Sequence, residues 1–127
     1  MADAVLDASA VLAVLRREPG ADTVAAIMPS AVISAVNLAE IISKLVERGA
    51  SPETACELVD QLPFSVAPFD ATLARRAGAL RSATRSKGLS LGDRCCLALA
   101  EQQGAPALTT DRRWAELNIG ISIQLIR

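Results

Sequence analysis

Histidine is absent from the 127-residue chain, and this absence limits the chemistry that the protein can perform. Histidine is the most common general base of enzymes and a usual ligand of zinc. Without it, Ser–His and Cys–His nucleophilic mechanisms are excluded. Any acid–base or metal chemistry must therefore depend on carboxylates.

Aromatic residues are also scarce, since only Phe64, Phe69 and Trp114 occur. The core must consist mainly of aliphatic side chains, and a platform of rings that stacks on nucleic-acid bases is not expected. Hydrophobic residues nevertheless make up 51% of the chain. This content is sufficient for the core of a single domain spanning residues 1–127.

No apolar stretch reaches the roughly 20 residues that a membrane-spanning helix needs. The acidic Asp3 and the lack of a basic segment near the start do not fit a signal peptide. We therefore expect no contact with a membrane and a cytoplasmic location. The three cysteines have no metal-ligand spacing, so we expect Cys56, Cys95 and Cys96 to be buried, unpaired thiols.

The net charge is −1, but the charged residues are unevenly distributed along the chain. Residues 1–70 carry 4 basic and 10 acidic side chains, whereas residues 71–127 carry 9 basic and 4 acidic ones. The basic C-terminal part could therefore attract a polyanion.

Short apolar segments alternate along the chain with segments of helical pattern. Strands are predicted at residues 4–6, 31–34, 64–67, 107–109 and 122–126. Helices are predicted at residues 9–17, with Ser9 as the cap, and at 21–28, 35–48, 52–62, 91–103 and 111–117, and a further long helix begins at Asp70 and ends before Lys87. This alternation predicts an α/β fold in which helices cover both faces of a parallel sheet.

Four acids occur in apolar surroundings: Asp7, Glu40, Asp93 and Asp111. A carboxylate that enters a core needs a partner. Asp7 and Asp111 follow the first and fourth predicted strands, and ligands of parallel sheets bind beyond the carboxyl ends of the strands. Asp93 begins the helix that returns to the fourth strand, so it should start from the same edge. We therefore expect a metal site there, and oxygen ligands without histidine or cysteine suit Mg²⁺.

Each of these acids also has a purely structural interpretation. Asp7 could be a turn residue, and Glu40 could pair with Lys44 one helical turn later. Asp93 fits a capping box with the serine three residues before it, and Asp111 could cap the last short helix. One carboxylate can serve as both a cap and a metal ligand, so both interpretations stay open.

Four segments resemble, in the same order, the acidic motifs of the PIN-domain ribonucleases: Val5–Val11, Asn37–Glu40, Leu91–Arg94 and Leu108–Arg112. The chain length, the turn at Arg16–Gly20 and the Leu-Gly-Asp-Arg sequence resemble in particular the toxins of VapBC-type toxin–antitoxin modules. The resemblance implies a PIN-like fold, with a five-stranded parallel sheet in the order 3-2-1-4-5 and helices on both faces. It also implies a Mg²⁺- or Mn²⁺-dependent endoribonuclease that cleaves RNA by metal-activated water.

The resemblance also assigns roles to individual residues. It implies that the catalytic metal ligands are Asp7, Glu40, Asp93 and Asp111. Hydroxyl groups of Ser9 and Thr110 would support them. Asn37 lies one helical turn before Glu40, where its amide could position a ligand or simply begin the helix. The implied partners are RNA, a second copy of the chain in a homodimer, and an antitoxin whose C-terminal segment occupies the cleft.

Arginines of the C-terminal part could hold the RNA backbone next to this negative site. The candidates are Arg81, Arg85, Arg94, Arg112 and Arg113. Arg112 directly follows Asp111, so we expect it to be the main phosphate contact. The alternative is that these arginines are solvated surface charges.

Three other functions remain open. A phosphoaspartate enzyme could use Asp7 as its nucleophile, but the haloacid-dehalogenase pattern requires a second acid where this chain has Ser9. A catalytically silent binding module would use the acids only to fix packing. A PIN nuclease could also process RNA outside any toxin–antitoxin module.

Overall fold

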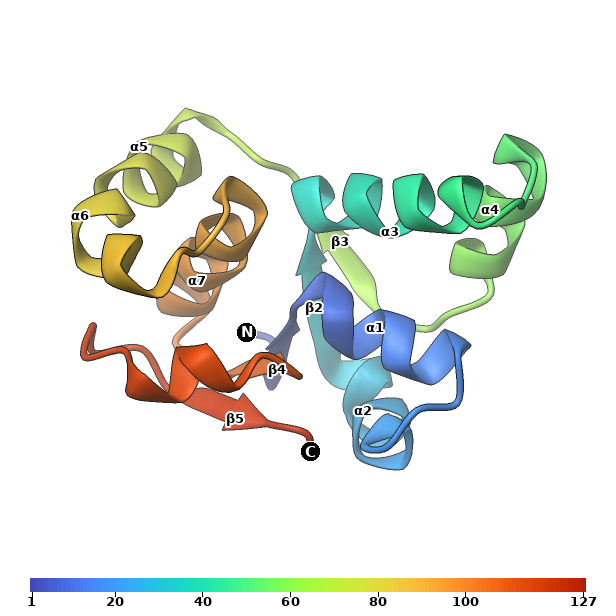
Figure 1. Cartoon of the computed structure of the whole chain (residues 1–127), viewed down its shortest axis with the longest axis horizontal. Coiled ribbons are helices and arrows are strands. Elements are labelled where there is room, and N and C mark those ends of the chain that lie inside the picture. Colours follow the sequence, from blue (N-terminus) through green and yellow to red (C-terminus); the bar gives the residue numbers. More distant parts are fainter.

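Five short parallel strands form the centre of the computed structural model, which describes residues 1–127 (Figure 1). The strands are β1 (Ala4–Leu6), β2 (Ala31–Ser34), β3 (Ser65–Ala67), β4 (Ala107–Thr109) and β5 (Ile123–Leu125). They are hydrogen-bonded in the order β3-β2-β1-β4-β5, and every pair is parallel. The predicted order is confirmed, and the fully buried β1 is the central strand.

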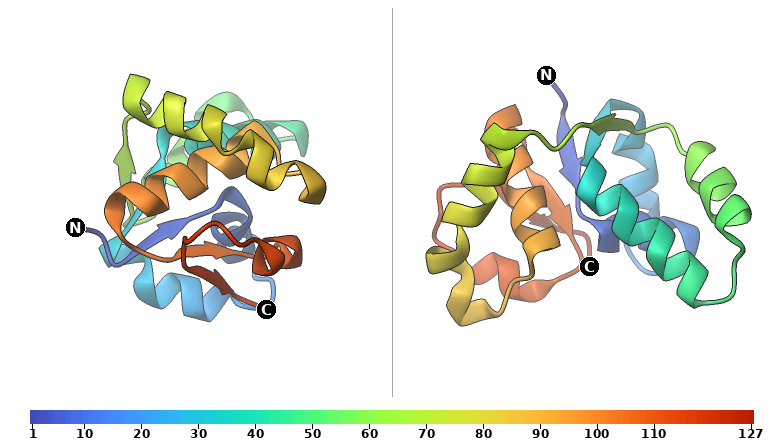
Figure 2. Two further views of the ribbon diagram at one scale, coloured as in Figure 1. Left: turned by 90° about the vertical axis from the view of Figure 1, so that its left-hand side faces the viewer. Right: turned by 90° about the horizontal axis from the view of Figure 1, so that it is seen from above.

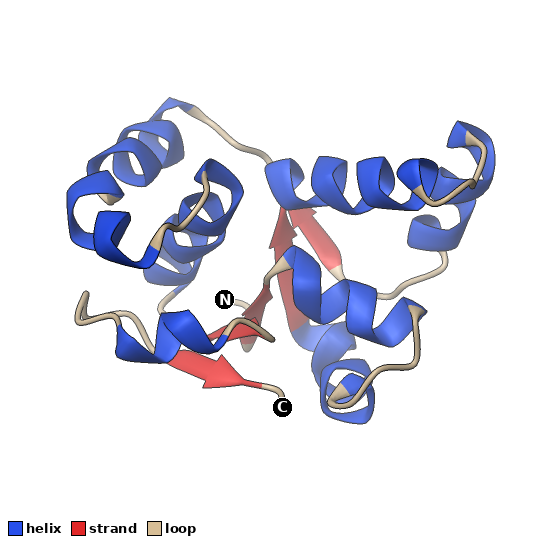
Figure 3. Ribbon diagram, viewed as in Figure 1, coloured by secondary structure: helices blue, strands red, loops and turns tan.

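Two groups of α-helices lie on opposite sides of this sheet (Figure 2, right; Figure 3). The first group is α1 (Ala8–Leu15), α2 (Ala21–Ile27), α3 (Ala35–Glu47) and α4 (Pro52–Asp60). The second group is α5 (Ala71–Ala79), α6 (Arg81–Thr84) and α7 (Leu91–Gln103). The short 3-10 helices are η1 (Met28–Ser30), η2 (Arg85–Lys87) and η3 (Arg112–Glu116). None of the helices combines the length and the apolar character that crossing a membrane requires.

Alternating side chains of the strands divide the core into two apolar clusters. Ala4 and Leu6 of β1 pack in the cluster that includes α1, whereas Val5 belongs to the cluster formed with α5 and α7. In α7, every residue from Cys95 to Ala100 is buried. This burial anchors the helix whose first turn carries Asp93.

Local signals in the sequence fix where the helices around the sheet begin. The Ser34 hydroxyl accepts a hydrogen bond from the Val36 amide at 3.2 Å at the start of α3. The Asp70 carboxylate accepts one from the Leu73 amide at 2.9 Å, so it caps α5 as predicted. Such caps satisfy amide groups that the first helical turn leaves unpaired.

The long helix predicted from Asp70 is interrupted at Leu80, so the prediction of one continuous helix was wrong. The buried Thr84 hydroxyl donates to the Leu80 carbonyl at 2.8 Å, beside the backbone bond from the Thr84 amide to the same carbonyl at 3.1 Å, and side-chain bonds of this kind often bend helices. Gly78, a weak helix former, lies two residues before the break. The chain therefore continues as α6 and η2, and the arginines beyond Leu80 lie on these separate short elements.

Three smaller expectations also differ from the structure. Asp7, not Ser9, occupies the cap position of α1, and its side chain makes no capping hydrogen bond. The last predicted helix is the 3-10 helix η3. Cys56 is exposed on α4, whereas Cys95 and Cys96 are buried as expected, and all three thiols are free.

Candidate active site

A cleft of about 340 Å³ opens where β1 and β4 end. Its lining consists of Asp7, Ala8, Ser9, Glu40, Lys44, Asp93, Thr110, Asp111 and Arg113. Because α7 begins at the edge where these strands end, Asp93 reaches the acids that follow the strands. The structure therefore brings together all four acids that the sequence singled out, from segments far apart along the chain.

Asp7 is the most buried of the four acids, with only 5% of its surface exposed. Its Oδ2 atom accepts hydrogen bonds from the hydroxyls of Ser9 at 2.7 Å and Thr109 at 2.9 Å. Burial raises the pKa of Asp7 to about 6, and the negative charges of Asp93 and Glu40 act in the same direction. Asp7 is thus a carboxylate held by neutral donors and without a cationic partner.

Glu40 is oriented by an amide from its own helix. The Asn37 Nδ2 atom donates to Glu40 Oε1 at 2.6 Å and to the Gly92 carbonyl at 3.0 Å, so it connects α3 to α7. Asn37 is completely buried, and its Oδ1 atom has no hydrogen-bond partner. The structure contains no ion pair between Glu40 and Lys44, the structural alternative that the sequence left open.

Asp93 forms the capping box at the start of α7. Its Oδ2 atom accepts from the Ser90 amide at 2.8 Å, and its own amide donates to the Ser90 hydroxyl at 3.2 Å. The carboxylate also lines the cleft. The capping role and the position in the cleft therefore occur together in one residue.

Asp111 is the only one of the four acids with a cationic partner. The Arg113 guanidinium donates to both carboxylate oxygens, through Nε at 3.0 and 3.1 Å and through Nη2 at 2.5 Å. The Arg113 amide donates to Oδ1 at 3.0 Å, so Asp111 also caps η3. The hydrogen bonds of the Arg113 side chain hold the pKa of Asp111 below its usual value.

Although the four acids share one cleft, no group of three or more His, Cys, Asp or Glu side chains is arranged around a common point as a metal site. Each carboxylate instead bonds its own protein partner. The donor set still suits Mg²⁺ or Mn²⁺, because it offers several carboxylate oxygens and no nitrogen or sulfur ligand.

Of the five arginines that the sequence suggested as RNA contacts, only Arg113 lines the cleft. Arg94 turns toward α5, where its Nη1 atom donates to the Ala77 carbonyl at 3.0 Å. Arg112, Arg81 and Arg85 are exposed outside the lining, on η3, α6 and η2.

Three residues around the cleft were not assigned a site role from the sequence. Thr109, rather than Thr110, supplies the second hydroxyl to Asp7. Gly92 lies against the Glu40 carboxylate so closely that a Cβ atom would overlap with it. Lys44 lines the cleft and has no ion-pair partner. A glycine in the first turn of an otherwise strong helix was the available signal for Gly92.

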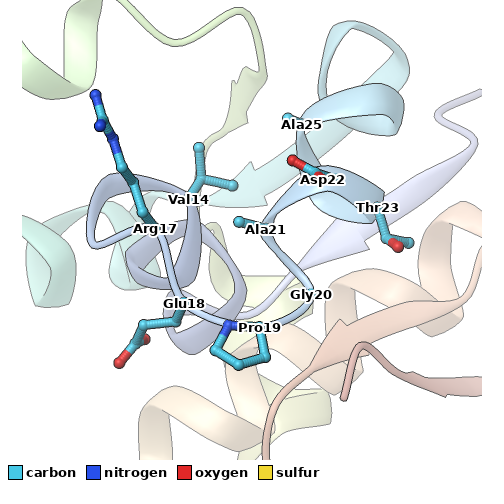
Figure 4. A pocket seen from close by; sticks show the side chains of 9 residues that line it. All are labelled: Val14, Arg17, Glu18, Pro19, Gly20, Ala21, Asp22, Thr23 and Ala25. Carbon is cyan, nitrogen blue, oxygen red and sulfur yellow. The ribbon is translucent and has the colours of Figure 1, made fainter.

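A larger hollow of about 610 Å³ lies away from the acids, at the turn between α1 and α2 (Figure 4). Its charged side chains, Arg17, Glu18 and Asp22, point in different directions and do not converge on a common point. The turn is tied to the end of the chain, since Arg127 Nη1 donates to the Pro19 carbonyl at 3.2 Å. These contacts fix the turn and do not assemble a reactive group.

Several solved structures have the same fold as this chain. A chain of DNA-bound VapBC from Salmonella typhimurium superposes with a TM-score of 0.77 and 20% identity, over 100% of both chains. VapBC2 from Rickettsia felis, bound to a promoter DNA fragment, gives 0.74 and 14%, over 96% of this chain and 97% of that chain. VapC20 from Mycobacterium tuberculosis, described as a toxin that cleaves the sarcin-ricin loop, gives 0.72 and 20%, over 91% and 96%. At these identities the similarity establishes the fold alone.

No curated protein matches the chain in sequence. The family model of the PIN domain, by contrast, matches residues 4–120 and so includes all four acids of the cleft. The chain therefore belongs to the PIN domain family.

Proposed function

We propose that this protein is an endoribonuclease that depends on a divalent cation, Mg²⁺ or Mn²⁺. The observation that carries the proposal is the chemistry of the cleft. Four carboxylates line it, the chain has no histidine, and the most buried acid, Asp7, has no cationic partner. Membership of the PIN domain family supports a nuclease.

In this proposal the cation is held by Asp7, Glu40, Asp93 and Asp111. When bound, it would polarise the phosphodiester and lower the pKa of a water molecule. The residues around it have positioning roles. Ser9 and Thr109 fix the carboxylate of Asp7 through their hydroxyls, and Asn37 fixes that of Glu40. These contacts keep the two carboxylates in place without neutralising them.

Basic side chains around the cleft would bind the RNA backbone. Lys44 lines the cleft without an ion-pair partner, and the exposed Arg112 directly follows Asp111. Arg81 and Arg85 extend the basic surface on α6 and η2. Contacts of this kind bind phosphate in any sequence, so they supply affinity without base specificity.

A toxin role is the form of this proposal that the structural similarities favour. The similar chains come from VapBC complexes and from VapC20, described as a toxin that cleaves the sarcin-ricin loop. On this basis we propose that the chain has an antitoxin as its protein partner. Assembly as a homodimer and action in the cytoplasm complete the proposal, and they follow from the sequence and its resemblance to the toxins.

Cleavage of total cellular RNA by the purified protein tests the proposed activity. We expect cleavage with Mg²⁺ or Mn²⁺ and none with EDTA. Asp7→Asn should reduce the rate by roughly 100-fold or more, because it removes a ligand from the centre of the site. Asp3→Asn, which removes an exposed carboxylate just before β1, should cleave like the unmodified protein. Equal cleavage by the Asp7→Asn variant, or cleavage that persists in EDTA, would contradict the proposed site.

A further inference from the structure

The Arg113 guanidinium occupies the hydrogen-bonding positions of the Asp111 carboxylate. Nε bonds both Oδ1 and Oδ2, and Nη2 bonds Oδ2 as well. Paired guanidinium contacts of this kind are stronger and more directional than hydrogen bonds between neutral groups. Asp111 thus differs from the other three acids of the cleft, whose partners are hydroxyls and amides.

Arg113 also connects Asp111 to the segment that leads into α7. Its Nη1 atom donates to the Lys87 carbonyl at 2.8 Å, while the Lys87 ammonium pairs with Glu116 at 2.9 Å. These two contacts join η3 to η2, immediately before the turn that presents Asp93. The guanidinium is therefore positioned by both neighbouring segments and not only by its acid partner.

A guanidinium and a divalent cation cannot bind the same carboxylate oxygens from the same side. Both are cations that gain from the negative charge of Asp111 and its neighbours. Arg113 also lines the cleft, so it lies on the side from which a cation would approach.

We propose that Arg113 is an internal counter-charge that competes with a divalent cation for Asp111, so that the cation binds there only when the guanidinium withdraws. This inference rests on the proposed function, since it concerns the same carboxylates. Its consequence is that the apparent affinity for the cation is lower than the carboxylates alone would give. The cation can bind Asp111 only in the state in which Arg113 has withdrawn, and this state is one of two. It also separates the roles of two adjacent arginines, since the Arg112 side chain forms no hydrogen bond or ion pair with the Asp111 carboxylate.

Calorimetric titration with Mn²⁺ tests the competition directly, without any RNA. Arg113→Ala should bind Mn²⁺ more tightly than the unmodified protein, by roughly tenfold, a usual size for coupling between two sites. Arg113→Met, which keeps the aliphatic stem and its packing, should show the same gain if the alanine variant folds poorly. Arg112→Ala removes the same charge one residue away and should leave Mn²⁺ affinity unchanged.

A second substitution shows whether the effect acts through Asp111. Asp111→Asn should weaken Mn²⁺ binding. Adding Arg113→Ala to this variant should not increase the Mn²⁺ affinity, because the carboxylate for which Arg113 competes is already absent. In EDTA, Arg113→Ala should also lower the melting temperature, since the acids then lack their internal counter-charge.

The possible results separate this inference from the proposed function. If the unmodified protein binds Mn²⁺ and neither Arg113 variant binds it more tightly, the competition is refuted while the metal site stands. If the gain persists in the Asp111→Asn background, Arg113 does not act through Asp111 and the inference is also refuted. If no variant binds Mn²⁺, the proposed metal-dependent function fails together with it.

Discussion

The floor and the rim of the acidic cleft hold their carboxylates by different means. The floor consists of Asp7 and Glu40, whose partners are neutral groups. One of these donors comes from a distant segment, since the Thr109 hydroxyl reaches Asp7 from β4. The Asn37 amide that orients Glu40 is local, but it also donates to the Gly92 carbonyl of α7. The floor therefore exists only when the whole fold is assembled.

The rim consists of Asp93 and Asp111, which are satisfied by groups close in sequence. Asp93 bonds Ser90 three residues earlier, and Asp111 bonds Arg113 two residues later. The contacts of these two carboxylates lie within the first turns of α7 and η3, although the Arg113 guanidinium also bonds the Lys87 carbonyl of η2.

This difference indicates at which acids a negative charge lowers the stability of the fold. Rim acids have their hydrogen bonds supplied locally, and Asp111 has a counter-charge as well. Asp7 in the floor is desolvated and repelled by other acids, which is the reason that its pKa is raised. Substitutions in the floor should therefore change stability more, and with a stronger dependence on pH, than substitutions in the rim.

Asp7→Asn should produce the largest change in stability, measured in EDTA. The folded protein binds the Asp7 proton more tightly than the unfolded chain, because burial raises the pKa from 3.8 to about 6. The stabilising contribution of the neutral acid is complete below pH 4 and is lost as pH rises through about 6. A shift of this size corresponds to about 3 kcal/mol. The asparagine variant should thus be more stable than the unmodified protein by up to this amount at pH 8 and no more stable at pH 4.

Urea denaturation at several pH values measures this effect. Asp3→Asn provides the matched control, because it removes one exposed carboxylate and should alter the pH dependence little. An Asp7→Asn variant whose advantage stays constant from pH 4 to 8 would show that the charge of Asp7 is not the cause.

Gly92→Ala should produce the second largest change in stability, because Gly92 of α7 lies against the Glu40 carboxylate of the floor. The added Cβ atom would overlap with the Glu40 carboxylate, and overpacking of this kind costs about 1–3 kcal/mol. Gly78→Ala is the matched control, since no atom lies within 4 Å of its added Cβ atom and alanine favours a helix by roughly 0.5–1 kcal/mol. The free energy of unfolding should fall in the first variant and rise in the second. A gain in both variants would mean that Glu40 moves aside without cost.

Elements could be predicted from the sequence where apolar runs and end signals coincide. For α7, Ser90 and Gly104 mark both ends, and the buried stretch from Cys95 to Ala100 contains no glycine or proline. The alternation of strands and helices predicts a parallel sheet, but it does not give the strand order, which came from the resemblance to a family. The interruption at Leu80 could not be predicted, because the residues around it, Ala79 to Arg81, include no proline or glycine.

The acids of the cleft could be selected from the sequence, because carboxylates in apolar runs are conspicuous. Their partners could not, because they depend on the direction of each side chain. Successive residues at the end of a strand point to opposite sides, so Thr109 rather than Thr110 gives its hydroxyl to Asp7. A step of about 100° along the helix likewise turns Arg94 away from the cleft that Asp93 lines.

Ser90→Ala should have the smallest effect of the three substitutions and should measure how independent the rim is. Ser90 caps α7 through the Asp93 amide, and Ser51 caps α4 in the same way through the Thr54 amide at 3.1 Å, far from the acids in sequence. Loss of such a cap typically costs about 1 kcal/mol. We expect Ser90→Ala and Ser51→Ala to lower the free energy of unfolding by the same amount at every pH between 5 and 8. The part of the pH dependence of stability that comes from Asp7 should be the same in both variants as in the unmodified protein. A larger loss in Ser90→Ala, or a shift in that pH dependence, would show that Asp93 is coupled to Asp7 strongly enough for the rim and the floor to act as one electrostatic unit.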